Sequence, residues 1–373
     1  MDPRSKEDLF NALAETMEAD GPAKTDFNQL ALQLFAWQYA RMQPYRRLCD
    51  SRGLTPETVK QWQAVPPVPT AMFKQMTLFA GAQSEIQQSF STSGTTGTGE
   101  KGRSHFSALG LRLMETSIRL NASKMLFPDE EKMHILVLAP SPQMAPEMIM
   151  AWGMQRLIEH FGTDQSRFLI GKEGLDVPLL VQLLKQFQQE ETPVTLIGAS
   201  FGFVNLLEGL KAKGLSFRLP LGSRTMDAGG YKGRSRELCR DELDAWLEEG
   251  FGVAPGMSVN LLGMTELASQ LYDDTIAATL AGESPKRHKI NCPWTKTAVV
   301  DPLSLEFLPD GQEGCLMHMD LANLDTPFCV LTDDLGVRTD TGFKVLGRLS
   351  ADQSRGCSLT VDEMTRGASN NDR

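Results

Sequence analysis

The stretch that decides the fold of this chain is Ser91-Thr92-Ser93-Gly94-Thr95-Thr96-Gly97-Thr98-Gly99-Glu100-Lys101-Gly102. Glycines let backbone N–H groups approach an anion closely, and consecutive N–H groups in such a turn form a concave anion-binding site. The serine and threonine hydroxyls can donate hydrogen bonds to phosphate oxygens, and Lys101 adds a positive charge. The stretch therefore predicts a loop that holds the phosphates of a nucleotide. Taken alone, it is also compatible with a Gly/Thr-rich surface turn.

Two common nucleotide-binding loops do not fit this stretch. In a Walker A loop a lysine follows the second glycine, and a serine or threonine follows that lysine. Here Glu100 stands where the lysine should be, and Gly102 follows Lys101. A Rossmann fingerprint needs a βαβ unit and a later acidic residue, and that context is missing. Instead, residues 87–91 and 103–106 predict one strand that enters the loop and one that leaves it.

Composition excludes several classes of protein. The 373 residues are 41% hydrophobic, which suffices for a sizeable core in one large domain or two to three smaller ones. The net charge of −10 argues against a nucleic-acid-binding protein, which normally presents a basic patch. The sequence shows no signal peptide and no apolar run long enough to cross a membrane, so we expect a cytoplasmic protein. The six scattered cysteines form no CxxC pair and predict reduced thiols.

The pattern of apolar residues predicts an α/β protein. Residues 1–88 read as a helical N-terminal region, and strands alternate with helices over 89–290, which predicts a mainly parallel sheet covered by helices. The clearest helix is 176–190, where Asp176 can cap the first turn. Short strands separated by turns over 291–365 predict a small β subdomain. Residues 366–373 are expected to form a flexible tail.

Later motifs carry further candidate site residues. Glu266, in Gly263-Met264-Thr265-Glu266, follows a predicted strand and can hold Mg²⁺ between phosphates. The same segment can instead begin a helix, with Thr265 as its cap. Asp334 can accept hydrogen bonds from ribose hydroxyls, or it lies in an ordinary Asp-rich turn. Gly229-Gly230 and Arg348 are likewise compatible with a plain glycine turn and an exposed arginine that ends a strand.

The order of these motifs resembles that of the adenylate-forming, AMP-binding superfamily, which includes acyl-CoA synthetases and firefly luciferase. The glycine loop resembles Thr-Ser-Gly-Thr-Thr-Gly-x-Pro-Lys-Gly, although Thr-Gly-Glu precedes Lys101 here. Residues 262–266 resemble Tyr-Gly-x-Thr-Glu, with Leu262 in place of the tyrosine that stacks on adenine. Residues 331–336 resemble Thr-Gly-Asp-Leu-Gly, with Asp333 in place of the glycine.

This resemblance implies the layered α/β N-terminal core of that superfamily with a small β subdomain, lacking most of the mobile C-terminal domain. It implies ATP and Mg²⁺ as cofactors, a carboxylic acid as substrate, and Glu266 as the metal ligand. It also implies catalytic roles for Glu266, Lys101 and Thr265. The nucleotide-binding residues that it implies are Thr92, Ser93, Gly94, Thr95, Thr96, Gly97, Gly229, Gly230, Gly263, Asp334 and Arg348.

A nearer resemblance is to the LuxE-type acyl-protein synthetases of bacterial bioluminescence. It covers nearly the whole chain, including residues 66–74, the glycine loop, 229–232, 331–336, 347–348 and 355–359. It implies that a long-chain fatty acid is activated as acyl-AMP and carried as a thioester on Cys357, for an acyl reductase or a thioesterase partner. Arg355 is two residues away and favours a reactive thiolate there. Cys357 can equally be a small side chain that packs a terminal strand.

Two other functions stay open. One is an aryl- or acyl-CoA ligase of the phenylacetate-CoA ligase type, against which the missing C-terminal domain counts. The other is a degenerate ATP-binding scaffold for a reductase complex. Leu262 and Asp333 favour the second, because both depart from the superfamily motifs.

Overall fold

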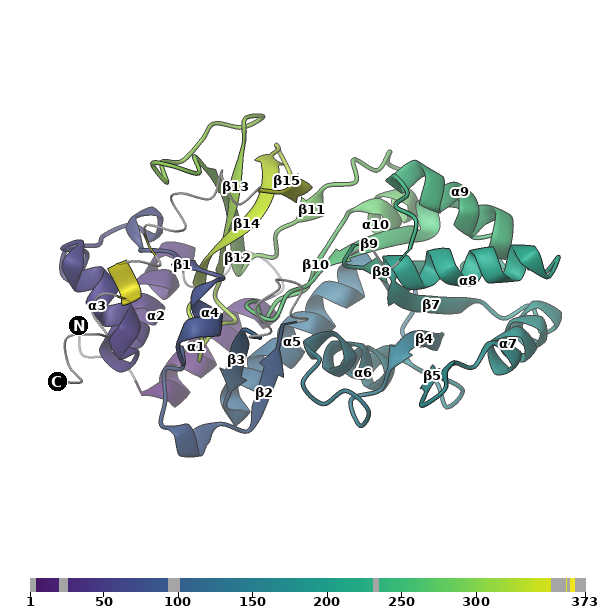
Figure 1. Ribbon diagram of the computed structural model, residues 1–373, viewed down its shortest axis with the longest axis horizontal. Coiled ribbons are helices and arrows are strands. Elements are labelled where there is room, and N and C mark those ends of the chain that lie inside the picture. The colour runs from purple at the N-terminus through teal and green to yellow at the C-terminus, as the bar shows by residue number, and fades with distance from the viewer. Residues whose placement is uncertain are drawn as a thin grey trace. The chain divides into compact units, whose positions relative to one another are not determined.

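In the computed structural model the chain forms two units (Figure 1). The first unit comprises Met1–Leu120, Met264–Ser269 and Ile290–Arg373, and the second comprises Asn121–Gly263 and Gln270–Lys289. The structure describes residues 5–19, 26–92, 101–230, 235–349, 360 and 363–365. Within that part of the chain, no helix is long and apolar enough to cross a membrane.

Helices form the N-terminal part of the first unit. They are α1 (Lys6–Glu18), α2 (Phe27–Arg41), α3 (Gln43–Ser51) and α4 (Met72–Gln75), and α5 (Ala108–Met125) begins in this unit. Ser5 and Asp8 form a capping box at the start of α1, which satisfies two backbone N–H groups that the helix leaves unpaired. The Asp26 side chain accepts a hydrogen bond at the start of α2 in the same way.

A six-stranded sheet forms the C-terminal part of the first unit. Its strands are β1 (Val68–Pro69), β11 (Lys289–Ile290), β12 (Thr295–Val300), β13 (Glu313–Asp320), β14 (Cys329–Arg338) and β15 (Gly342–Arg348). The strand order is β11-β15-β14-β13-β12, and β1 pairs in parallel with β14. Separately, β2 (Gln88–Ser91) and β3 (Arg103–Phe106) form an antiparallel pair on either side of the glycine loop, as the sequence predicts.

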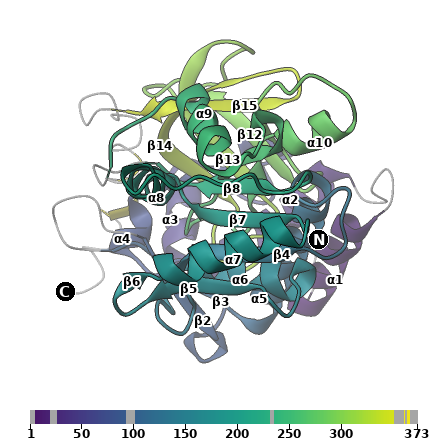
Figure 2. The ribbon, with the colours of Figure 1, turned by 90° about the vertical axis from the view of Figure 1, so that its right-hand side faces the viewer.

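The second unit is built on a seven-stranded sheet of order β10-β9-β8-β7-β4-β5-β6 (Figure 2). Its inner neighbours, from β9 to β5, pair in parallel. The strands are β4 (His134–Pro140), β5 (Arg167–Gly171), β6 (Gly174–Leu175), β7 (Val194–Ala199), β8 (Arg224–Ala228), β9 (Ser258–Leu262) and β10 (Leu271–Tyr272). The helices are α6 (Ile149–Phe161), α7 (Val177–Gln189), α8 (Ser200–Ala212), α9 (Arg240–Phe251) and α10 (Thr275–Leu280).

One apolar cluster holds α7, α8 and α9 against this sheet. Leu136 of β4 and Leu196 of β7 lie in the same cluster as Phe187 of α7, Phe203 of α8 and Phe251 of α9. Each such side chain stabilises the fold by about 1.5–3 kcal/mol when it is fully buried. The alternation of parallel strands with covering helices confirms the predicted α/β architecture.

The loop that joins β13 to β14 is buried along its whole length. Residues 321–328 are all shielded from solvent, although connecting loops normally run over the surface. A buried backbone must find internal partners for its N–H and C=O groups. Gln38 of α2 supplies several: its amide donates to the carbonyl oxygens of Asn323 (2.7 Å) and Thr326 (2.6 Å) and accepts from the Phe328 N–H (3.1 Å).

Candidate functional site

Thr92 and Gly102 close the base of the glycine loop. The Thr92 N–H donates to the Gly102 carbonyl oxygen at 2.8 Å, and the Gly102 N–H donates to Thr92 Oγ1 at 2.9 Å. A Cβ atom on Gly102 would lie only 3.1 Å from Thr92 Cγ2, so a larger residue there would crowd this closure. Lys101 is exposed beside it. The predicted phosphate-binding residues Ser93, Gly94, Thr95, Thr96 and Gly97 lie outside the described residues.

Glu266 lies in the turn after β9, and its side chain is buried. Burial raises the pKa of this carboxyl group to about 7, because a charged carboxylate loses its hydration there. The charge of Arg348 and that of Lys74 lower the pKa, whereas the charge of Asp334 raises it. The structure therefore brings these four charged side chains of the first unit within electrostatic reach of one another.

The segment around Thr265 and Glu266 is not the start of a helix. Residues 264–269 form turns and bends, and the Leu267 N–H donates to the Met264 carbonyl oxygen at 3.2 Å. The helix-start alternative is therefore wrong. Gly263 directly follows β9 in the second unit. A larger residue there would be crowded, because its Cβ atom would lie 2.9 Å from Met150 Sδ.

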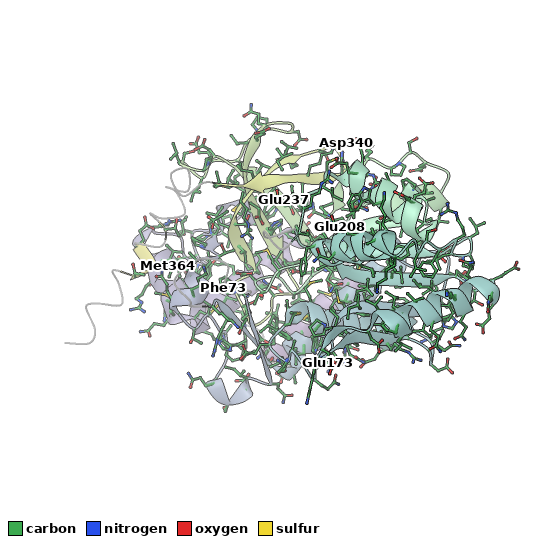
Figure 3. All side chains as sticks on the ribbon, turned by 45° about the vertical axis from the view of Figure 1, so that its right-hand side comes forward. Phe73, Glu173, Glu208, Glu237, Asp340 and Met364 are labelled. Carbon is green, nitrogen blue, oxygen red and sulfur yellow. The ribbon has the colours of Figure 1, made fainter. Side chains whose placement is uncertain are left out.

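Lys74 lies near Glu266 and Gly102, although it is not among the site residues that the sequence predicts. It lies on α4 beside Phe73, which is buried and is labelled in Figure 3. A Cβ atom on Gly102 would lie 3.5 Å from Lys74 Cγ, so Lys74 lies against the base of the glycine loop. Its charge also acts on Glu266. An ammonium group between a phosphate-binding loop and a carboxylate is suited to hold a phosphate oxygen.

Asp334 and Arg348 form a pair across two strands of the β subdomain. They lie directly opposite each other in the register of β14 and β15, and Arg348 Nε donates to Asp334 Oδ1 at 2.9 Å. The Asp334 side chain is 15% exposed and that of Arg348 is 71% exposed. The predicted ribose-binding residues are therefore adjacent, and the arginine side chain is accessible to a ligand.

The glycine pair Gly229-Gly230 follows β8 in the second unit. Gly229 has a φ of 74°, which glycine adopts without strain. Ser200, at the start of α8, donates to the Gly229 carbonyl oxygen (3.0 Å) and to Asp227 Oδ2 (2.7 Å). Asn260 of β9 donates to the same carboxylate oxygen at 2.8 Å. Polar groups thus gather near the carboxyl ends of β7 and β8, and open α/β sheets bind ligands at the carboxyl ends of their strands.

Ser200, Asp227 and Asn260 are not among the residues that the sequence predicts for the site. A Cβ atom on Gly229 or Gly230 would meet nothing within 4 Å, so the pair leaves open space beside it. That space suits the close approach of a planar base. Cys357, the predicted acyl acceptor, lies outside the described residues. Among the described cysteines, Cys239 is exposed.

A groove of about 280 Å³ runs along α8 in the second unit. Its apolar lining consists of Leu138, Ile170, Leu175, Val177, Leu206 and Leu210. Gly202 and Gly209 line it from α8, and a Cβ atom at either would meet nothing within 4 Å. These glycines therefore open the groove along two turns of the helix. From residue 202 to Lys213 the groove follows α8 over roughly 16 Å.

The residues present fit ATP with Mg²⁺. Among the described residues, no group of three or more His, Cys, Asp or Glu side chains could hold a metal. A single carboxylate such as Glu266 can bind Mg²⁺ when phosphate oxygens supply further ligands, which is how Mg²⁺ commonly binds. Lys74 and Arg348 would supply positive charge to the phosphates and the ribose region, and Asp334 would accept the ribose hydroxyls.

Sequence comparison places the chain in a family. The family model described as "Acyl-protein synthetase, LuxE" matches residues 13–365. The chain is 23% identical over 346 residues to the long-chain-fatty-acid–luciferin-component ligase of Vibrio harveyi, covering 90% of this chain and 87% of that protein. It is 21% identical over 347 residues to the ligase of the same name from Aliivibrio fischeri, with the same coverage.

Solved structures share the fold. A 2-hydroxyisobutyryl-CoA ligase in complex with 2-HIB-AMP and CoA superposes with a TM-score of 0.65 at 16% identity, over 93% of this chain and 68% of that one. ATP-bound MatB from Rhodopseudomonas palustris gives a TM-score of 0.51 at 16% identity, over 72% of this chain and 49% of that one. These likenesses confirm the predicted layered α/β fold. The chain belongs to the LuxE family of acyl-protein synthetases.

Proposed function

We propose that this enzyme activates a long-chain fatty acid with ATP and Mg²⁺ and transfers the acyl group to a protein cysteine thiol, for use by an acyl reductase. The observation that carries the proposal is the buried Glu266 carboxylate, set near Lys74, Asp334 and Arg348 in the unit that holds the glycine loop. The two curated relatives are named for ligation of long-chain fatty acids. Family membership and this cluster of charges support the same chemistry.

The first step forms an acyl adenylate. A carboxylate oxygen of the fatty acid attacks the α-phosphorus of ATP, and the bond from that phosphorus to the bridging oxygen of the leaving pyrophosphate breaks. No protein nucleophile is needed, so catalysis consists of alignment and charge stabilisation. Mg²⁺, when bound, neutralises charge that develops on the pyrophosphate. In this proposal the glycine loop, from Thr92 to Lys101, holds the phosphates.

In the second step a thiol takes the acyl group. The sulfur of Cys357 attacks the acyl carbonyl carbon as a thiolate, the carbon–oxygen bond to AMP breaks, and AMP leaves with its electron pair. The proton of the thiol is released to water. Both steps together consume one fatty acid, one ATP and one thiol, and they give one thioester, AMP and pyrophosphate.

The groove along α8 supports an aliphatic rather than an aryl acid. It is elongated, apolar and roughly 16 Å long, which suits an extended alkyl chain better than a compact ring. Its first lining residue on α8 is Gly202, two residues after Ser200, whose hydroxyl contacts Gly229. We place the acyl chain in this groove, with its carboxyl end toward Gly229.

The proposed function is tested by labelling. The purified protein is incubated with ATP, Mg²⁺ and labelled acids from benzoate to hexadecanoate, with and without CoA. We expect a hydroxylamine-labile label on the protein itself that requires ATP and is strongest with one long-chain acid. Acyl-CoA formed from an aryl acid without protein labelling would support the CoA-ligase alternative. ATP binding without pyrophosphate exchange on any acid would support the scaffold alternative.

Glu266→Gln should lower ATP–pyrophosphate exchange by about 10²-fold, because the neutral amide cannot serve as an anionic Mg²⁺ ligand. The change is isosteric, so the fold is expected to persist. Glu208→Gln, on an exposed residue of α8 that is labelled in Figure 3, is the matched control and should exchange normally. An unchanged exchange rate in Glu266→Gln would remove this residue from metal binding.

The same variant should be more stable than the wild type at high pH without nucleotide and Mg²⁺. The pKa of Glu266 rises from 4.5 to about 7 in the folded state, so the native protein holds a proton that the unfolded chain releases between these values. The wild type therefore loses on the order of 3 kcal/mol of unfolding free energy as pH rises through this window. The melting temperatures of Glu266→Gln and of the wild type should be similar near pH 4, and that of the wild type should be lower by pH 8. Equal pH profiles would contradict the burial argument.

Cys357→Ser should still catalyse ATP–pyrophosphate exchange with the preferred acid but should carry no hydroxylamine-labile label, because a serine ester resists hydroxylamine far more than a thioester. Cys239→Ser is the matched control, since Cys239 is the exposed cysteine among the described residues. Its labelling should equal that of the wild type. A labile label that persists in Cys357→Ser would exclude Cys357 as the acceptor.

Gly209→Leu should fill the groove and shift chain-length preference downward. We expect kcat/KM for hexadecanoate to fall by about 10-fold or more, with a smaller change for octanoate, since lost apolar contact scales with chain length. Glu208→Leu adds the same side chain one residue away, outside the groove lining. It should leave the ratio of kcat/KM for hexadecanoate to kcat/KM for octanoate unchanged. A normal ratio in Gly209→Leu would mean that the acyl chain binds elsewhere.

A further inference from the structure

The segment that carries Glu266 has no regular structure of its own. Residues 264–269 are neither helix nor strand, so no helical or sheet hydrogen bonds fix their backbone. Thr265 and Glu266 are nevertheless buried, with 6% exposure each. Another part of the chain must therefore hold this segment in place. The hydrogen bonds show that this part is the buried loop between β13 and β14.

Asn323 contacts the backbone on both sides of Leu267. Its Nδ2 donates to the Glu266 carbonyl oxygen at 2.8 Å, and its Oδ1 accepts from the Ala268 N–H at 2.7 Å. Nδ2 also donates to the Pro327 carbonyl oxygen at 2.9 Å. The side chain is fully buried. Both donor hydrogens and the acceptor oxygen are thus used, and only one orientation of the amide satisfies them.

Asp320 fixes the far end of the same segment. Its carboxylate accepts from the Ser269 N–H at 2.7 Å and from Ser269 Oγ at 2.8 Å. Ser269 Oγ also accepts from Trp294 Nε1 at 3.0 Å. Asn323 and Asp320 together therefore hold residues 266, 268 and 269 from one side.

The loop that presents Asn323 is itself anchored at several points. Besides Gln38, Asp325 accepts from the N–H (2.7 Å) and the hydroxyl (2.8 Å) of Ser107. Lys6 Nζ lies 2.8 Å from the other oxygen of the Asp325 carboxylate. Helices α1 and α2 and the start of α5 thus brace the loop. A side chain carried by a braced, fully buried loop can hold another residue with little freedom.

We propose that Asn323 is a positioning residue for Glu266. Its amide sets the path of the backbone through residues 266–268 and thereby directs the Glu266 carboxylate toward Lys74, Asp334 and Arg348. The inference rests on the proposed function, since it assumes that Glu266 binds Mg²⁺ with ATP. Groups that orient a metal ligand commonly change metal affinity or activity by about 10- to 100-fold when they are replaced.

Asn323→Asp tests the role of the amide. The substituted carboxyl keeps an acceptor for the Ala268 N–H but presents an oxygen where Nδ2 donates to two carbonyl oxygens, so the segment should shift. We expect the Mg²⁺ concentration for half-maximal ATP–pyrophosphate exchange to rise about 10-fold or more, while the KM for the fatty acid changes little. A merely structural role would not separate these two constants.

Asp325→Asn is the matched control. It makes the reverse isosteric exchange in the same buried loop, at a residue that contacts Ser107 and Lys6 rather than Glu266. It should lower the melting temperature and, because Asp325 only braces the loop that carries Asn323, raise the Mg²⁺ requirement less than Asn323→Asp does. A wild-type Mg²⁺ requirement in folded Asn323→Asp, as judged by circular dichroism, would overturn the inference.

Ser269→Ala is the second variant for this test, to be used if Asn323→Asp does not fold. It removes one hydroxyl from the end of the segment, while Trp294 Nε1 keeps its hydrogen bond to Ser117 Oγ at 3.0 Å. We expect about a 3-fold rise in the Mg²⁺ requirement, since one of the segment's several anchors is lost. No rise would overturn the inference.

Failure of this inference is distinguishable from failure of the proposed function. If the wild type shows no exchange with any acid, the proposed function fails. If Glu266→Gln exchanges normally, the metal role of Glu266 fails. If both behave as expected and the Asn323 and Ser269 variants keep the wild-type Mg²⁺ requirement, only the positioning role of Asn323 is wrong.

Discussion

A loop buried in a protein interior must find a partner for each of its polar groups, and this constraint shapes the first unit. The residues between β13 and β14 are shielded from solvent, so water cannot satisfy their backbone. Gln38 of α2 bonds to three backbone groups of the loop instead, and Ser107 and Lys6 pair with the buried carboxylate of Asp325. In turn, Asn323 of the loop and Asp320 at the end of β13 bind the turn that carries Glu266. Helices, loop and turn therefore form one hydrogen-bonded assembly.

Burial of Glu266 lowers the stability of the protein when this carboxyl group is ionised. A carboxylate with the burial of Glu266 is less stable ionised than in water, and the two nearby cations offset only part of that cost. A group with these surroundings is poised to gain from a divalent cation, because the metal replaces the hydration that the carboxylate has lost. Perturbed pKa values of this kind are typical of functional sites, although structural ion pairs also produce them.

Local patterns predicted the elements that depend on neighbours in sequence. The helix after Asp176 forms as expected: the aspartate caps it, and Leu180, Leu184 and Phe187 are buried on one face. The two strands around the glycine loop also form where residue types indicate them. Motif order likewise pointed to Glu266, Asp334 and Arg348, which the structure brings together.

The contributions of Lys74 and Asn323 could not be predicted in the same way. Lys74 acts on Glu266 through space, and the resemblance of residues 66–74 to the LuxE type indicated no role for this lysine. Asn323 lies in a stretch that reads as an ordinary connection, and the burial of that stretch depends on partners far away in the sequence. Hydrophobic periodicity and motif spacing depend on a window of neighbouring residues, so they cannot predict contacts between distant parts of the chain. The helix-start alternative for Thr265 failed for the same reason, since Asn323 and Asp320 override local capping preference.

The hydrogen bonds of Gln38 also bear on how the chain is made. Gln38 and Asn323 are 285 residues apart, and the intervening chain includes the whole second unit. A ribosome that adds 5–20 residues per second needs roughly 15–60 s to travel between them. During that interval α2 has left the exit tunnel with a glutamine and an apolar face that lack their final neighbours. The second unit is complete before the first can close, so nascent chains of this protein pass through a state with one finished unit and one waiting for its C-terminal strands.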